Sequence, residues 1–293
     1  MRYLPCLFLL LGGLLLWSCQ EPVPIYGIAY ITDLDGDFNI YYTDQNGENH
    51  HQLTANPGMD WAPAWDEAGK RIIHYATDTS QQFLILSKSL LGEEIPLNTE
   101  GLSEYILSPD GHMALFTLKD SLQQFIYAYQ VKSGDSLELV THPSYNGRPS
   151  WSPDSKWISF ISDRHGNNEL FALRVEDGSL KRLTYTPGRE KYHSWSADGS
   201  TIFYTMASTA NQNNIFQVKL ATAESVALTA DTLLYEELAC SPDGKKLAYH
   251  TKKDCEHHIY TMNLDGTGEQ KITQQQAYHG EPEWIVLPSE KNP

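Results

Sequence analysis

The amino-acid sequence predicts an all-β protein, a six-bladed β-propeller built from four-stranded blades. Three observations lead to this fold class. Two short sequence tags recur along the chain with nearly the same period. The 293 residues include 17 Tyr and 7 Trp, residue types that favour strands. No window shows the pattern of an amphipathic helix, and a period of this length indicates a repeat architecture.

The first tag reads Trp-Ser-Pro-Asp-Gly in its fullest form. It begins, at intervals of 42 to 45 residues, at Trp65, Leu107, Trp151, Trp195, Cys240 and Trp284, although the last copy keeps only its Trp. The second tag is Leu-Thr or a close variant. It begins, at intervals of 43 to 45 residues, at Leu53, Leu97, Val140, Leu183, Leu228 and Ile272. Two tags in phase over most of the chain predict six similar structural units.

Each unit reads as four short strands. In the unit around Trp151, the first strand ends at the tag, and Pro153-Asp154 then forms a tight turn because Pro presets φ. A second strand follows at residues 157–160, a polar hairpin at 163–166 and a third strand at 169–171. Another turn at 177–178 leads to the Leu-Thr strand. Four strands per 40–50 residues, repeated radially, predict a propeller.

The phase of the repeat predicts how the propeller closes. The segment 27–30 matches a second strand, whereas the segment 282–284 matches a first strand. The C-terminal strand should therefore complete a blade with three N-terminal strands. This pairing leaves no free sheet edge.

The N-terminus has the features of an export signal. Arg2 precedes an apolar run from Leu4 to Trp17, and these 14 residues would span about 21 Å as a helix, short of the roughly 30 Å hydrocarbon core. The run ends in Leu16-Trp17-Ser18-Cys19, which resembles a bacterial lipobox and implies lipidation of Cys19. The alternative is ordinary secretion with an incidental Cys.

The predicted domains are a signal peptide at 1–18, a tether at 19–26, the propeller at 27–287 and a tail at 288–293. Beyond Cys19 the chain has Cys240 and Cys255. Their expected places at opposite ends of one strand put them roughly 20 Å apart at 3.3 Å per residue. A disulfide needs Cα atoms within about 7 Å, so both thiols should be free.

The units resemble the TolB-like propeller repeat. Its consensus runs Leu-Thr, Pro-x-Trp-Ser-Pro-Asp-Gly, an apolar strand, Ser-Asp-x-x-Gly and an apolar-Tyr/Phe strand. Residues 149–171 match it almost throughout, and the likeness covers about residues 27–287. The resemblance implies the propeller fold and says little about function, because the tags are strand and turn residues.

Alternating strand direction sorts the connections by face. The linkers that enter the first strands should surround one end of the central tunnel, which we call the tunnel mouth. The positions three and five before the Trp tag fall there, with their neighbours. The candidate ligand-binding residues are Asp60, Trp61, Glu104, Arg148, Glu190, Tyr192, His193, Tyr235, Glu237, His279 and Glu281. Carboxylates, one Arg, His and aromatic residues suit a cation, glycan or peptide. The alternative is solvated loops of an acidic protein.

Other clusters of His and acidic residues are better explained as strand and turn residues than as ligand-binding sites. His279, Glu281 and Glu283 alternate and would share one face of a strand, but three such groups arise easily by chance, so no metal is predicted. The pairs His50-His51 and His257-His258 are expected to be exposed. The acidic loop 33–37 coincides with the hairpin of other units and lacks the distal Glu of an EF-hand.

The functional hypothesis is a non-catalytic binding module. The sequence contains no Gly-x-Ser-x-Gly, His-Glu-x-x-His, phosphate-loop or dinucleotide motif, so neither a catalytic residue nor a cofactor is predicted. The expected partner is an envelope protein or a cell-wall or glycan ligand, bound by a monomer. The alternative is a glycan-active lyase or hydrolase that uses rim carboxylates or a His-bound metal.

Composition and the leader set the expected surroundings. The chain has 37 Asp plus Glu against 21 Lys plus Arg, a net charge of −16, which repels phosphate backbones and excludes nucleic acid as a partner. The expected location is the cell envelope. A lipid anchor would hold the protein on the outer membrane, facing the periplasm or the cell surface, and would be its sole membrane contact.

Overall fold

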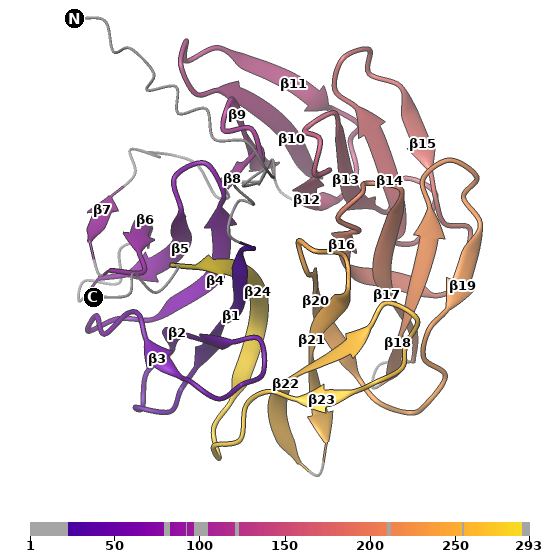
Figure 1. Ribbon diagram of the computed structural model, residues 1–293. Helices are drawn as coiled ribbons and strands as arrows, with labels where there is room; N and C mark the ends of the chain where they lie inside the picture. Colours follow the sequence, from indigo (N-terminus) through magenta and orange to yellow (C-terminus); the bar gives the residue numbers. More distant parts are fainter. Residues whose placement is uncertain are drawn as a thin grey trace, which may run out of the picture.

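The computed structural model describes residues 23–78, 83–91, 93–96, 105–120, 123–209, 212–253 and 255–288. Six antiparallel sheets of four strands each are arranged radially about a central axis (Figure 1). These residues form strands, turns and loops, and nothing in this part of the chain is a helix suited to crossing a membrane. The predicted fold class and blade number are confirmed.

Each sheet is one blade, and its strands run outward in order. The innermost strands of blades 1 to 6 are β24 (His279–Leu287), β4 (Asp60–Asp66), β8 (Ile106–Leu107), β12 (Asn146–Trp151), β16 (Arg189–Trp195) and β20 (Tyr235–Cys240). The second strands are β1 (Ile25–Thr32), β5 (Arg71–Thr77), β9 (Met113–Asp120), β13 (Trp157–Ser162), β17 (Thr201–Thr209) and β21 (Lys246–Lys253). The third strands are β2 (Asn39–Asp44), β6 (Phe83–Ser89), β10 (Gln123–Gln130), β14 (Glu169–Arg174), β18 (Gln212–Lys219) and β22 (Glu256–Asn263). The outer strands are β3 (His51–Gln52), β7 (Glu94–Pro96), β11 (Ser136–Val140), β15 (Leu180–Arg182), β19 (Ser225–Ala227) and β23 (Gln270–Lys271).

Blade 1 is closed by the two ends of the chain. β24 pairs antiparallel with β1, from Ile25 opposite Leu287 to Thr32 opposite His279. The sheet continues through β2 to β3, so one C-terminal strand joins three N-terminal strands. The predicted closure is therefore confirmed.

The Trp of the first tag joins neighbouring blades. The indole N–H of Trp151 donates to the carbonyl of Ile106 in the preceding blade, at 3.1 Å. Trp284 donates in the same way to the carbonyl of Ala239, at 2.9 Å. A buried indole normally finds such a partner. Three of the repeated Trp residues, Trp151, Trp195 and Trp284, thus hydrogen-bond to the preceding blade.

The remaining tag residues fix turns and strand ends. The Ser152 hydroxyl donates to the Asp154 carboxylate at 2.6 Å and accepts the backbone N–H of Trp157 at 2.9 Å. The same Ser–Asp bond recurs in the turns of blades 3, 5 and 6. In the Leu-Thr tag, the Thr184 hydroxyl accepts the N–H of Leu170 at 2.8 Å. These local hydrogen bonds explain why the two sequence tags recur at a regular period.

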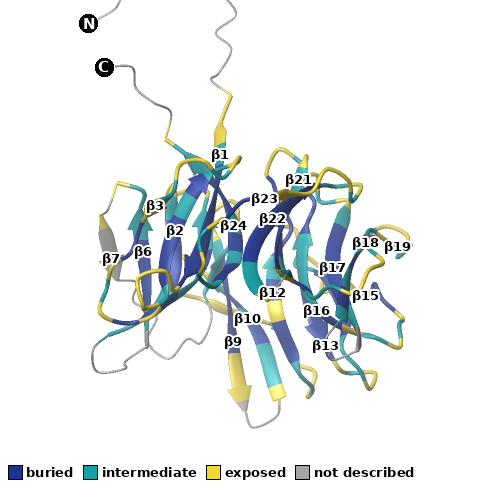
Figure 2. Ribbon diagram, turned by 90° about the horizontal axis from the view of Figure 1, so that it is seen from below, coloured by how far each residue is buried: buried dark blue, intermediate teal, exposed yellow. Residues whose placement is uncertain are grey.

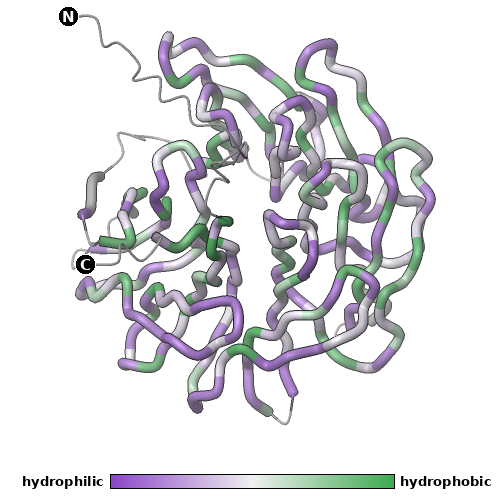
Figure 3. Tube along the Cα trace, viewed as in Figure 1, coloured by the Kyte–Doolittle hydropathy of each residue, from purple (hydrophilic) through white to green (hydrophobic). Residues whose placement is uncertain are grey.

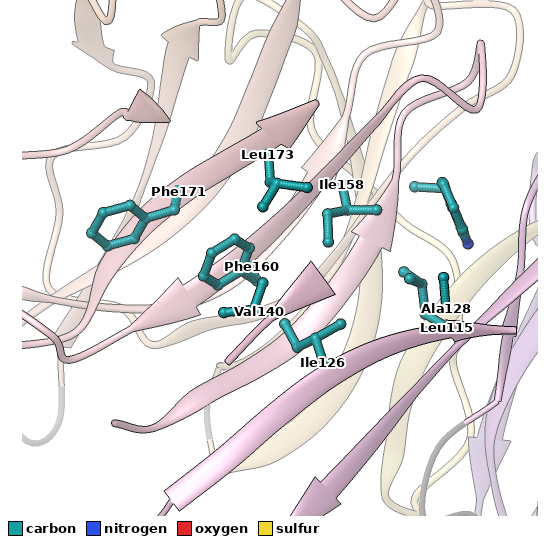
Figure 4. Close-up of a cluster of buried hydrophobic side chains, with 9 residues drawn as sticks. Leu115, Ile126, Ala128, Val140, Ile158, Phe160, Phe171 and Leu173 are labelled. Atoms are coloured by element: carbon teal, nitrogen blue, oxygen red, sulfur yellow. The ribbon is translucent and has the colours of Figure 1, made fainter. Parts of the chain in front are cut away.

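Apolar side chains fill the space between adjacent blades. One cluster joins Leu115, Ile126, Ala128 and Val140 of blade 3 to Trp151, Ile158, Phe160, Phe171 and Leu173 of blade 4 (Figure 4). Hydrophobic and hydrophilic residues follow one another along the strands, as two-faced packing requires (Figure 3). Burial is greatest along the middle of the blades (Figure 2).

Strand direction places the turns on two faces. β1 begins and β24 ends on one face, which is also the face of the Pro-Asp-Gly turns (Figure 2). The first strands begin on the opposite face. Cys240 ends β20 and Cys255 lies in the hairpin between β21 and β22; both cysteines within the described ranges are free, as predicted.

Candidate functional site

The innermost strands share a backbone irregularity three residues before the Trp tag. Pairing to the second strand shifts there in blades 1, 2, 4, 5 and 6. Four of the residues at this position have left-handed backbones: Ala62, Arg148, Glu237 and Glu281, with φ between 49° and 54°. Each is the extra residue of a β-bulge, which re-aims a side chain next to a site.

Backbone N–H groups at the bulges bind side chains of the preceding blade. The N–H of Glu281 donates to Oε2 of Glu237 at 2.6 Å. The N–H of Ala62 donates in turn to Oε2 of Glu281 at 2.5 Å. A chain of carboxylate-to-amide bonds therefore links the bulges of blades 6, 1 and 2.

The bulges line a central cavity of about 420 Å³ where the innermost strands converge (Figure 1). Its polar side chains come from all six blades: Tyr75, Tyr105, Ser150, Arg148, Tyr192, His193, Glu237, Glu281 and Glu283. The apolar part of the wall includes three prolines, each one residue after a bulge: Pro63, Pro149 and Pro282. The cavity lies in the half of the tunnel nearer the tunnel mouth, because the lining residues of the innermost strands precede the tag and Tyr75 pairs with one such residue, Trp61.

Carboxyl groups dominate the electrostatics of the cavity. Burial raises the pKa of Glu237 to about 7, and the neighbouring Glu281 adds to this shift. Burial also raises the pKa of Glu283 to about 7 and raises that of Glu281. Glu237 and Glu283 can therefore exchange protons near neutral pH.

Arg148 is the cation of the cavity wall. Its Cζ lies 4.1 Å from the centroid of the Tyr192 ring, a cation–π contact. Burial, together with Arg148, lowers the pKa of His193 to about 4, so His193 is neutral at pH 7. The site thus offers one guanidinium, several carboxyl groups and aromatic surface.

Position three before the tag reaches the cavity, but position five does not. Asp60, Glu190, Tyr235 and His279 are at most 3% exposed and lie between strands instead of at the rim. Asp60 faces His74 at 3.4 Å, and His279 stacks on His258 with 5.3 Å between ring centroids. The expectation that they face the mouth fails because the bulge interrupts the side-chain alternation. Trp61 is half-buried and packs against the core between blades 1 and 2.

Two predicted residues cannot be placed. Glu104 and the lipidation residue Cys19 lie outside the described residues, as do the signal segment, residues 19–22 of the tether and residues 289–293 of the tail. The proposed roles of Glu104 and Cys19 therefore rest on sequence alone.

The bulge also separates the three residues that could have formed a metal-binding face. His279 stacks on His258, whereas Glu281 and Glu283 line the cavity. Across the described ranges, no three His, Cys, Asp or Glu side chains are grouped so as to hold a metal ion. His51 is exposed as expected, but His258 is buried, because β22 places it inside blade 6.

Sequence analysis missed three residues of the site. Tyr75 and Tyr105 line the cavity, and His250 packs behind Glu237 with its Nδ1 3.5 Å from Oε2 of that residue. Tyr75 and His250 each lie ten residues after the tag, on second strands that pair with the bulged strands. The second-strand alternation, aligned on the tag, is the signal that could have found them.

The repeat, the closure and the shared bulges place the chain in a known group. The sequence profile of the TolB beta propeller domain family matches residues 102–288. The chain belongs to this family.

Curated relatives of this TolB-type propeller differ in length and name. An uncharacterized peptidase, YuxL of Bacillus subtilis, is 26% identical over 193 residues, which are 61% of this chain and 28% of that protein. The uncharacterized protein Atu1656 of Agrobacterium fabrum is 25% identical over 72% of this chain and 74% of its own length. A TolB homologue of Chlorobium luteolum is 24% identical over 89% of this chain and 60% of its own length. The chain therefore spans only part of two of these relatives.

Solved structures support the same architecture. TolB from Acinetobacter baumannii superposes with a TM-score of 0.78 at 23% identity, covering 88% of this chain and 66% of that one. A chain of the nidogen–laminin complex gives 0.68 at 15% identity, with 89% and 98% covered. An oligogalacturonate lyase in complex with manganese gives 0.58 at 14% identity, with 85% and 74% covered. At these identities the likeness concerns the fold.

Proposed function

We propose that this TolB-type propeller is a non-catalytic binding protein that holds a protein or another cell-envelope ligand at its tunnel mouth. One observation carries the proposal. The tags that build the fold repeat from blade to blade, whereas the bulge position facing the cavity carries Ala62, Arg148, Tyr192, Glu237 and Glu281 in turn. A repeated scaffold that presents different side chains to one cavity suits recognition of an asymmetric ligand.

The backbone conformation adds to this argument. A non-glycine residue in the left-handed region costs of order 1 kcal/mol, and glycine would relieve that cost. No bulge in the described blades uses glycine at this position. The strain is offset if the side chains of Arg148, Glu237 and Glu281 are needed in the cavity. The fold shared with one chain of a two-protein complex is consistent with protein binding.

A capture experiment tests the proposal. The mature chain, immobilised, should retain a partner from envelope extracts that the double variant Arg148→Ala, Tyr192→Ala does not retain. The matched control is Lys156→Ala with Glu176→Ala, two exposed residues in turns of the opposite face. Equal capture by all three proteins would overturn the tunnel mouth as the binding surface.

A glycan-active enzyme is the second candidate. The raised pKa of Glu237, about 7 through burial and Glu281, is the observation that favours it, since a general acid works best near the ambient pH. A thermal-shift screen with oligosaccharides, joined to an assay of their cleavage, separates the candidates. Cleavage lost in Glu237→Gln would replace the binding proposal, whereas no shift and no cleavage would favour binding alone.

We also propose that Cys19 carries a lipid anchor in the cell envelope. Residues 19–24 can span at most about 20 Å before β1 begins on the Pro-Asp-Gly face. The tunnel mouth would then point away from the membrane. Labelling with a radioactive fatty acid should mark the wild-type protein and not Cys19→Ala, and the variant should move from the membrane to the soluble fraction. Equal labelling of both proteins would exclude this anchor.

A further inference from the structure

A buried histidine lies behind the carboxylates of the tunnel mouth. The side chain of His250 on β21 is 3% exposed. Its Nε2 lies 2.9 Å from Nδ1 of His257, which is hydrogen-bond distance. Its Nδ1 has no hydrogen-bond partner. Leaving a buried polar atom unpaired costs roughly 1–3 kcal/mol, so this nitrogen calls for an explanation.

The unpaired nitrogen is directed toward two carboxylates. Nδ1 of His250 lies 3.5 Å from Oε2 of Glu237 and 3.9 Å from Oε2 of Glu236. Both distances exceed a normal hydrogen bond. Burial and the neighbouring His257 lower the pKa of His250 to about 3, so the ring is neutral and no ion pair forms. A proton on Nε2 satisfies the contact with His257 and leaves Nδ1 as an acceptor.

Three acceptor groups therefore face one another, and the described residues supply them with one donor, the backbone N–H of Glu281, which bonds Oε2 of Glu237. No Lys or Arg in the described part of the chain comes within ion-pair distance of Glu236 or Glu237. Arg148, the cation of the cavity, rests on the Tyr192 ring. The Glu236 carboxylate receives no hydrogen bond from the described residues. The side chains of Glu236 and Glu237 are 21% and 18% exposed, so solvent and ligands reach them.

An aromatic ring forms one side of this gap. Tyr278 packs against the rings of His250 and His257, with centroids 5.2 Å away in each case. Its hydroxyl feels the charges of Glu237, Glu281 and Glu236, which, after burial, raise its pKa. The gap thus has carboxylates and a neutral imidazole on one side and a π-face nearby.

We propose that the gap between Glu236, Glu237 and His250 binds a primary ammonium group, from a lysine side chain or the N-terminus of a protein partner. An ammonium supplies three N–H donors and no acceptor, which matches the unpaired Nδ1 of His250 and the lone pairs that remain free on the carboxylates of Glu236 and Glu237. Charge-assisted bonds to carboxylates and a cation–π contact with Tyr278 would both favour it. A guanidinium presents a planar fork of five donors and fits two carboxylates and one nitrogen less well. This inference rests on the proposed binding function and names the chemistry of its ligand.

Synthetic peptides test the inference directly. The probe is acetyl-Gly-Lys-Gly-amide, titrated into isotope-labelled protein and followed by NMR. We expect saturable shifts at the tunnel mouth, loss of binding when the lysine is Nε-acetylated, and roughly tenfold or greater weakening in Glu236→Gln with Glu237→Gln. The matched control, Glu138→Gln with Glu224→Gln, removes the same charge from exposed residues of blades 3 and 5.

Three different results would each contradict one part of the inference. Equal binding of the acetylated peptide would exclude an ammonium site. Equal weakening by the control variant would reduce the effect to general charge attraction. A third arm substitutes His250→Phe, which keeps a ring and removes the acceptor nitrogen. Unchanged lysine-peptide affinity in a folded His250→Phe protein would remove the imidazole from the proposal.

The pH dependence supplies a second readout. Burial and Glu281 hold the pKa of Glu237 at about 7, so ammonium binding displaces a proton and affinity should rise from pH 6 to pH 8. The other titratable or charged groups around Glu237 are Glu236, Glu281, His250, Tyr192, Tyr278 and Arg148. Burial raises the pKa of Glu281 as well, so its proton acts in the same direction as that of Glu237. A flat profile would contradict the assignment of Glu237.

Partner capture separates this inference from the proposed function. If the Glu236→Gln, Glu237→Gln protein retains the partner that Arg148→Ala, Tyr192→Ala loses, the tunnel mouth binds a partner but the ammonium site is wrong. If lysine peptides bind while no partner depends on Arg148 and Tyr192, the ammonium site stands and the proposed function fails.

Discussion

At the scale of single residues, Glu283 shows how the tunnel couples stability to pH. It precedes the tag residue Trp284, lines the cavity, and its Oε1 accepts the N–H of Trp65 at 3.2 Å. Burial raises its pKa from 4.5 to about 7. The folded chain therefore binds this proton more tightly than the unfolded chain, and stability should fall as pH rises from about 4.5 to about 7.

The variant Glu283→Gln keeps an acceptor for Trp65 and removes the charge. We expect it to be more stable than the wild type at pH 8, by up to about 3 kcal/mol, and equal to it near pH 4.5. Urea unfolding at several pH values measures the difference. The exposed Glu138→Gln serves as control and should show no such trend. A pH-independent difference for Glu283→Gln would contradict burial as the cause.

At the scale of elements, indole hydrogen bonds join an innermost strand to the innermost strand of the preceding blade. Trp284 is 4% exposed and donates to the carbonyl of Ala239, whereas Trp65 donates to Glu67 in its own turn. Trp284→Phe should leave a buried carbonyl without this donor and cost about 1–3 kcal/mol. Trp65→Phe should cost less, because its bond is exposed to water. Chemical denaturation of both variants tests this ranking. Equal losses in the free energy of unfolding would mean that the hydrogen bond between blades does not stabilise the protein.

The innermost strands also show what sequence could and could not predict. Tag residues such as Asp154 recur because they make the same local bond in several blades, so the period predicts blades, turns and closure. Arg148, Tyr192, Glu237 and Glu281 were found because the bulge position keeps a fixed offset from the tag.

The positions of the other side chains depend on features that the sequence tags do not reveal. A single extra residue in the innermost strands of blades 1 and 2 moved His279 and Asp60 from the expected mouth into the blade interior, and a bulge has no signature in alternation alone. The site around His250 combines side chains of β20, β21 and β22 and the residue before β24. Such a cluster arises from tertiary packing, which a repeat alignment does not contain.

At the scale of the whole molecule, the two faces have different roles. β1 begins and β24 ends on the Pro-Asp-Gly face, whereas the cavity is lined by residues of the half nearer the opposite face. The turn carboxylates account for part of the net charge of −16 and are satisfied locally; hydrogen bonds from Ser196 and Ser200, for example, lower the pKa of Asp198. At the tunnel mouth, Glu237 and Glu281 each accept one backbone N–H, whereas Glu236 accepts no hydrogen bond from the described residues, so acceptor capacity remains free on the face opposite the turns.

Closure of blade 1 gives the last prediction. A chain ending at Pro282 loses Trp284 and Ile285, which are 4% and 0% exposed, and with them most of the pairing to β1. Burial of two large apolar side chains alone is worth about 3–6 kcal/mol, and the lost strand also leaves β1 as an open edge beside the tunnel. We expect a large fall in melting temperature or a failure to fold.

A chain ending at Pro288 is the matched control, because it keeps all of β24 and removes a tail of only five residues. Its melting temperature should equal that of the longer chain. Differential scanning calorimetry of the two truncations distinguishes loss of closure from loss of length. An unchanged melting temperature for the chain ending at Pro282 would mean that β24 does not hold the ring together, and the six-bladed closure would have to be abandoned.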